Sequence, residues 1–136
     1  MDFNRLIPEL DVSNFARSLA FYTEVRGFQI EYDRPERQFA MLSCQGSQLM
    51  IEQANDVWKT AEREYPLGRG VNFQMLVDDV GVMLASVEAH GYPVMIGLEE
   101  RWYRRSRQFV GQRGFLVMDP DGHLLRFAQP LGVKEI

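Results

Sequence analysis

The feature that most constrains this chain is an internal repeat, because two copies of one sequence pattern fold in the same way. "LDVSNFARSLAFYTEVRGFQI" (10–30) matches "MLVDDVGVMLASVEAHGYPVM" (75–95) at an offset of 65 residues. Four positions carry related residues at this offset: Val12 and Val77, Asn14 and Asp79, Leu19 and Leu84, and Ala20 and Ala85. Self-similarity at a long period is the signature of a repeated structural unit. We therefore predict two copies of one module.

Each copy is predicted to contain an amphipathic helix. Apolar residues recur at i, i+4 and i+7 in both copies: Phe15, Leu19 and Tyr22, and Val80, Leu84 and Val87. This spacing places one side of a helix against a core. Helix ends are marked by the same residue types in both copies: Ser13/Asn14 and Asp78/Asp79 as N-caps, and Gly27 and Gly91 as stops.

One strand is predicted before each helix and three after it. In "VNFQMLV", Val71, Phe73, Met75 and Val77 alternate with Asn72, Gln74 and Leu76; earlier, Leu6, Pro8, Leu10 and Val12 alternate with Arg5, Ile7, Glu9 and Asp11. The later extended stretches are "FQIEYD", "FAMLSC" and "QLMIEQ" in one copy and "YPVMIG", "FLVMD" and "HLLRFAQ" in the other. The DPDG segment at 119–122 predicts a hairpin turn. The fold class is therefore α+β, with two tandem β-α-β-β-β modules.

The 136 residues are expected to form a single domain, 1–136, with modules at about 4–54 and 70–130. The segments 54–69 and 98–113 are interpreted as long loops, which often carry function. Residues 99–113 hold five arginines and two glutamates, a net +3 that leaves −7 for the rest of the chain: Arg101, Arg104, Arg105, Arg107 and Arg113.

Composition excludes several classes of function. The net charge of −4 disfavours nucleic acid as a partner, and no apolar run is long enough to span a membrane. The N-terminus lacks the pattern of a signal peptide, so the cytoplasm is the expected location. The single cysteine, Cys44, is expected to be a buried apolar residue. No nucleophile elbow or phosphate-binding loop is present in the sequence.

The paired modules, "DVSNFARSLAFYTEVRGF" and "DPDGHLLRF" resemble the vicinal oxygen chelate superfamily, which includes glyoxalases, bleomycin resistance proteins and dioxygenases. "MLSCQGSQLMIEQ" and "DPDGHLLRFAQ" are similar to hairpins of the bleomycin resistance branch. The resemblance implies a cup-shaped mixed sheet with helices on its convex side. It also implies a homodimer with the cups near the interface.

The resemblance further implies a test for a metal site. The positions that hold metal ligands in enzymes of the superfamily fall here on Ile7, Glu52, Asn72 and Arg126. Only Glu52 is a good ligand, and the fixed charge of Arg126 repels a cation. The expectation is no metal, no cofactor and no catalytic residue. Glu52 and Arg126 are expected to form an ion pair, within one chain or across two.

A cup without metal suggests a binding protein that sequesters a cationic or aromatic glycopeptide antibiotic of the bleomycin type, with no bond broken. Such a ligand requires aromatic surfaces and negative potential. The candidate ligand-binding residues are Phe39, Met50, Glu52, Trp58, Asn72, Gln74, Trp102, Tyr103, Phe115 and Arg126. Two alternatives remain: a glyoxalase- or dioxygenase-like metalloenzyme with an atypical site, and a binder of an unrelated aromatic metabolite. The arginines of 101–113 argue against a cationic ligand unless they pair with the acidic residues or point to solvent, and they leave room for an anionic or neutral aromatic ligand.

Overall fold

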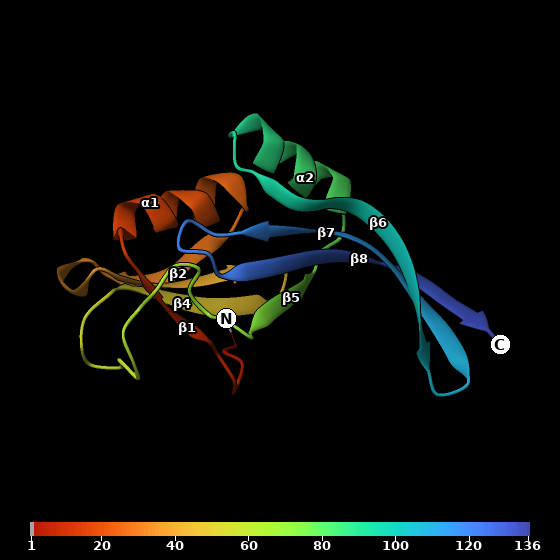
Figure 1. Ribbon diagram of the computed structural model, residues 1–136, viewed down its shortest axis with the longest axis horizontal. Helices are drawn as coiled ribbons and strands as arrows, with labels where there is room; N and C mark the ends of the chain where they lie inside the picture. The colour runs from red at the N-terminus through yellow and green to blue at the C-terminus, as the bar shows by residue number, and fades with distance from the viewer. Residues whose placement is uncertain (1) are drawn as a thin grey trace. The chain divides into compact units, whose positions relative to one another are not determined.

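The computed structural model describes residues 2–136, which divide into two compact units (Figure 1). Unit 1 runs up to Arg69 and also includes Asp119–Gly122; unit 2 comprises Gly70–Met118 and His123–Ile136. Each unit contains one four-stranded mixed sheet and one α-helix, so the predicted α+β class with two repeated modules is confirmed. None of the helices in residues 2–136 is long and apolar enough to cross a membrane.

The elements of unit 1 follow the predicted order. They are β1 (Glu9–Val12), α1 (Phe15–Ala20) with a π-helical turn (Phe21–Val25), β2 (Gln29–Arg34), a 3-10 turn (Pro35–Arg37), β3 (Phe39–Cys44) and β4 (Ser47–Gln53). The strand order is β1-β4-β3-β2, with β1 parallel to β4 and the other pairs antiparallel. Helix α1 packs on β4 and covers one face of this sheet.

Unit 2 repeats this plan with longer strands. It contains β5 (Asn72–Leu76), α2 (Val80–Ala89), β6 (Val94–Arg105), β7 (Gln108–Met118) and β8 (Leu124–Glu135). The strand order is β5-β8-β7-β6, with β5 parallel to β8. Helix α2 contacts β6, β7 and β8 on one face. In each unit the opposite side of the sheet is called here the helix-free face.

The helix ends form as the sequence predicts. The side chain of Asn14 accepts a hydrogen bond from the backbone N–H of Arg17, and that of Asp79 accepts one from Val82. Gly27 and Gly91 follow the two helices with φ of +72° and +76°. Only glycine adopts this left-handed conformation without strain, so these two residues fix where each helical segment ends.

The buried helix faces differ from the prediction by about one residue. In the first helical segment the buried residues are Ser18, Phe21, Tyr22 and Val25, whereas Phe15 and Leu19 are half-buried. In α2, Met83 is buried beside Val80 and Val87, and Leu84 is half-buried. The predicted i+7 residues, Tyr22 and Val87, are buried as expected.

The DPDG turn supplies two buried carboxylates to unit 1. The Tyr22 hydroxyl donates to Asp119 at 2.7 Å, and the backbone N–H of Ser13 donates to Asp121 at 3.0 Å. Burial, followed by the charge of Asp119, raises the pKa of Tyr22, so its phenol stays protonated as the donor.

The expected loop at 98–113 is wrong, because this segment belongs to two long strands. β6 and β7 pair as far as Arg105 and Gln108, and β8 continues beside β7 to Glu135. Residues 99–113 and 129–135 thus form a three-stranded extension, called here the arm (Figure 1). Both faces of the arm carry charged side chains, so the apolar alternation that predicts a half-buried strand is missing.

Trp102 is part of the structure of the arm. A Cβ placed on Gly111 would lie 2.6 Å from the Trp102 ring, so the indole packs directly on this glycine of the neighbouring strand. The ammonium of Lys134 lies 4.0 Å from the centroid of the same ring. The indole therefore links β6, β7 and β8, the kind of packing by which an aromatic ring stabilises a glycine position in a sheet.

We predict that Gly111→Ala displaces the Trp102 ring, because the added methyl group occupies its position. In a Trp58→Phe background, emission from Trp102 should shift to the red, and the free energy of unfolding should fall by about 1 kcal/mol. Gly97→Ala is the matched control, since a Cβ at this β6 glycine meets no atom within 4 Å. An unchanged emission maximum in Gly111→Ala would contradict the packing described.

Candidate functional site

The helix-free face of unit 1 places aromatic residues and carboxylates in neighbouring rows. The strand register aligns Arg34, Phe39, Glu52 and Asp11 in one row, and Tyr32, Met41, Met50 and Glu9 in the next. Alternation along each strand puts these side chains on one side, while Leu10, Val12 and Ile51 point into the core beneath α1. The aromatic residues lie on β2 and β3, and the carboxylates lie on β4 and β1.

Glu52 is buried on this face, with 5% of its surface exposed. The side-chain amide of Asn55 donates to Glu52 at 2.7 Å, and the Arg37 guanidinium lies 3.8 Å away. Glu9 lies on the neighbouring strand β1, in the row next to that of Glu52. Burial and then the charge of Glu52 raise the pKa of Glu9.

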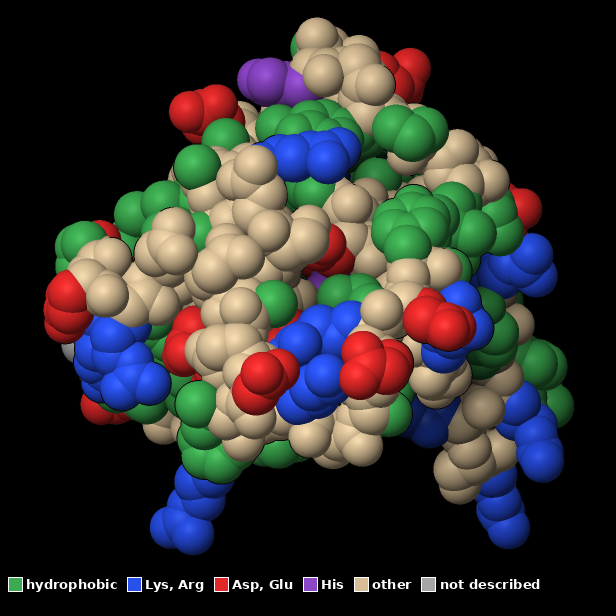
Figure 2. All heavy atoms as spheres, turned by 60° about the vertical axis from the view of Figure 1, so that its left-hand side comes forward, with side chains coloured by type: hydrophobic (Ala, Val, Ile, Leu, Met, Phe, Trp, Pro, Cys, Tyr) green, Lys and Arg blue, Asp and Glu red, His purple; other side chains and the backbone are tan. Residues whose placement is uncertain are grey.

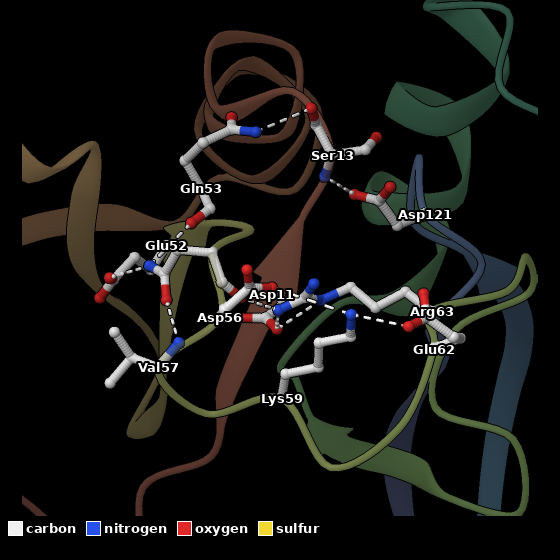
Figure 3. Close-up of polar contacts among 11 residues, drawn as sticks. Asp11, Ser13, Glu52, Gln53, Asp56, Val57, Lys59, Glu62, Arg63 and Asp121 are labelled. Atoms are coloured by element: carbon white, nitrogen blue, oxygen red, sulfur yellow. Dashed lines mark hydrogen bonds and ion pairs between the residues drawn. The ribbon is translucent and has the colours of Figure 1, made fainter.

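The connection after β4 folds back onto β1 through Arg63 (Figure 3). Its Nε and Nη2 donate to Asp11 at 2.8 and 2.7 Å, and Nη2 also donates to the backbone carbonyl of Asn55. Lys59, in the same connection, pairs with Glu62 at 2.8 Å. On the face drawn in Figure 2, basic side chains likewise lie beside acidic ones.

Three aromatic rings lie next to one another in space at the β2 end of these rows. The rings of Phe3 and Tyr32 meet edge to face at 5.8 Å, and Tyr32 and Phe39 lie 6.0 Å apart with tilted planes. Tyr32 is 40% exposed and Phe39 is 3% exposed. Arg34 places its guanidinium over both Tyr32 and Phe39.

The helix-free face of unit 2 combines polar side chains with apolar neighbours, since Leu116 and Leu124 lie in the same rows as Arg126 and Asn72. Gln74 lies opposite Arg126 in the β5–β8 register, and Nε of Arg126 donates to the side-chain oxygen of Asn72 at 2.8 Å. Glu52 and Arg126 belong to different units, and each has a hydrogen-bond partner within its own unit. Their ion pair stays a prediction.

The structure groups the predicted ligand-binding residues into five places. Phe39, Met50 and Glu52 share the helix-free face of unit 1, and Asn72, Gln74 and Arg126 share that of unit 2. Trp58 lies in the connection after β4, 68% exposed, while Trp102 and Tyr103 belong to the arm. Phe115 is fully buried against Phe127 in the core of unit 2. It does not reach the helix-free face, because alternation in β7 puts it on the same side as Val117.

Sequence reasoning missed six residues of the unit 1 face: Glu9, Asp11, Tyr32, Arg34, Arg37 and Arg63. Glu9 and Asp11 could have been predicted from the sequence, because alternation along the first strand already places them on the same side as Ile7. Arg37 and Arg63 lie in a turn and a connection, where no period indicates the direction of a side chain. Only their contacts in the folded chain identify them.

The residues at the expected metal-ligand positions do not fit a divalent metal. One is Ile7, and two others, Asn72 and Arg126, are hydrogen-bonded to each other. In residues 2–136, no three His, Cys, Asp or Glu side chains converge in a way that could hold a metal ion. Glu52 alone does not make a metal centre.

We predict that Glu9 makes the stability of the protein depend on pH. The pKa of Glu9 is raised in the native state. Its stabilising contribution to the free energy of unfolding is therefore complete below the unfolded-state pKa of 4.5 and is lost as pH rises through the native pKa. Glu9→Gln removes this loss, so its unfolding midpoint should exceed that of the wild type by about 2 °C near neutral pH. Near pH 4, the two midpoints should differ less.

Thermal unfolding from about pH 4 to pH 8 measures this difference. Glu24→Gln is the control, because Glu24 is an exposed residue of the π-helical turn with the same charge. A difference between Glu9→Gln and the wild type that does not change with pH would contradict the raised pKa of Glu9.

Comparison with known proteins agrees with this geometry. Residues 7–127 match the model of the Glyoxalase/Bleomycin resistance protein/Dioxygenase superfamily. The bleomycin resistance protein of Geobacillus stearothermophilus is 25% identical over 132 residues, covering 92% of this chain and 96% of that protein.

Two solved structures from Agrobacterium tumefaciens show the same fold. A protein of unknown function (24% identity) superimposes with a TM-score of 0.71, covering 96% of this chain and 97% of that one. A lactoylglutathione lyase (20% identity) superimposes with a TM-score of 0.59, covering 93% and 94%. The match to the family model extends over nearly the whole chain, from β1 to β8. The chain belongs to the Glyoxalase/Bleomycin resistance protein/Dioxygenase superfamily.

Proposed function

We propose that this protein binds a small molecule with a flat aromatic part and a cationic part, without a metal and without breaking a bond. A single observation carries the proposal: aromatic rings and carboxylates, among them the buried Glu52, lie in adjacent positions on one face of one sheet. Phe39 and Glu52 are direct neighbours in the β3–β4 register. A ligand lying across these strands reaches both side chains once it displaces the guanidinium groups of Arg34 and Arg37.

Each part of this face suits a different part of the ligand. The rings of Phe3, Tyr32 and Phe39 offer edges and faces for stacking. Glu52 and Asp11 carry negative charge that attracts a cation, and the burial of Glu52 strengthens the attraction by excluding water. Unit 1 has a net charge of −5, from eight basic and thirteen acidic residues, which favours encounter with cations.

The similarity to bleomycin resistance proteins supports bleomycin as the first ligand to test. We propose that the protein sequesters such an antibiotic and acts in the cytoplasm as a homodimer. Light scattering of the purified protein tests the dimer. Metal analysis of the same sample tests the alternative of a metalloenzyme.

Isothermal titration of metal-free bleomycin into the protein tests binding directly. We expect a dissociation constant in the micromolar range or tighter, which corresponds to about −8 kcal/mol. Glu52→Gln should weaken binding about tenfold, because a charged hydrogen-bond acceptor is lost while the shape of the side chain is kept.

Glu24→Gln is the matched control, because it changes the net charge equally at an exposed residue outside this face. Circular dichroism confirms that each variant is folded. No binding heat with the wild type at high drug concentration, or equal weakening in both variants, would contradict the proposal.

A further inference from the structure

The aromatic surface of unit 1 already holds a planar cation of the protein itself. The central guanidinium carbon of Arg34 lies 4.7 Å from the ring centroid of Phe39 and 5.4 Å from that of Tyr32. Arg34 and Phe39 are direct cross-strand partners in β2 and β3. The guanidinium is flat and positively charged, as is the part of the ligand proposed for these rings.

Arg34 differs from the other arginines on this face. Arg37 lies 3.8 Å from Glu52, and Arg63 binds Asp11 at 2.7 Å. Arg34 forms no such ion pair within residues 2–136, and the contacts of its guanidinium are with the two rings. It lies on the edge strand β2 and is exposed to solvent.

We propose that Arg34 is a specificity-determining residue, which occupies the stacking surface until a planar cationic group of the ligand takes its place. The inference rests on the proposed function, since it concerns the same face and the same class of ligand. It adds that the protein contains its own competitor for that surface. A ligand group that is not both flat and positively charged gains less from the rings than Arg34 does, so replacing Arg34 with it is unfavourable in free energy.

Displacing Arg34 from the rings costs little free energy. A cation over an aromatic ring at an exposed site contributes about 0.5–1 kcal/mol. An arginine released from the rings regains the rotamer freedom that stacking removes. The next residue in the same row, Glu52, attracts the incoming cation as it attracts Arg37.

Proflavine, a flat fluorescent cation, is the probe for this exchange. Fluorescence titration compares the wild type with Arg34→Ala and with Arg17→Ala. Arg17 is an exposed residue of α1, so its loss changes the net charge equally outside the helix-free face. We expect Arg34→Ala to bind proflavine about fivefold more tightly than Arg17→Ala does, because the competitor is removed.

The double variant Arg34→Ala/Tyr32→Leu locates the gain. Tyr32 is 40% exposed, so its replacement leaves the core intact, and the fivefold gain should shrink when only Phe39 remains beneath the guanidinium position. Equal affinities of Arg34→Ala and Arg17→Ala would overturn the inference. An undiminished gain without Tyr32, weaker binding in Arg34→Ala, or no proflavine binding by any variant would also overturn it.

A parallel titration with metal-free bleomycin separates the two proposals. Drug binding by the wild type with equal proflavine affinities in the two single variants supports the proposed function and refutes the exchange. A Tyr32-dependent proflavine gain without drug binding supports the exchange and refutes bleomycin as the ligand.

Discussion

Glu52 is a carboxylate buried on a β-sheet, and the chain around it is arranged to offset its charge. Burying an ion without partners costs several kcal/mol, so partners have to come from neighbouring segments. Asn55 donates from the connection after β4, and Arg37 approaches from the turn before β3. The geometry of this face follows from satisfying one buried charge.

The two helix-free faces share one strand plan but differ in chemistry. In unit 1, rings on β2 and β3 lie beside carboxylates on β4 and β1. In unit 2, the corresponding strands carry Asn72, Gln74 and Arg126, and the amide of Asn72 accepts from the arginine. A repeated module therefore keeps apolar residues in its core, while the residues of the other face diverge.

Every cation on the unit 1 face has an interaction that a ligand can replace. Arg37 and Arg63 contact carboxylates, and Arg34 covers two rings. In the proposed function, a cationic ligand exchanges with these arginines, and its affinity depends on that exchange. Selectivity then arises from what the ligand offers beyond what arginine already provides.

The sequence by itself determined the repeated module and which side chains of its first strands face the core. Alternation put Met75 and Val77 in the core and Gln74 on the opposite face, and local capping by Asn14, Asp79, Gly27 and Gly91 set the helix ends. These signals depend on residues within a few positions of each other.

Only the tertiary structure decided the contacts of Arg34, Arg37 and Arg63, the buried position of Phe115, and the arm formed by residues 99–113 and 129–135. The arm has charged side chains on both faces, and its indole packs on a glycine of the next strand. Such features arise from pairing between distant segments, and no local period encodes which segments pair.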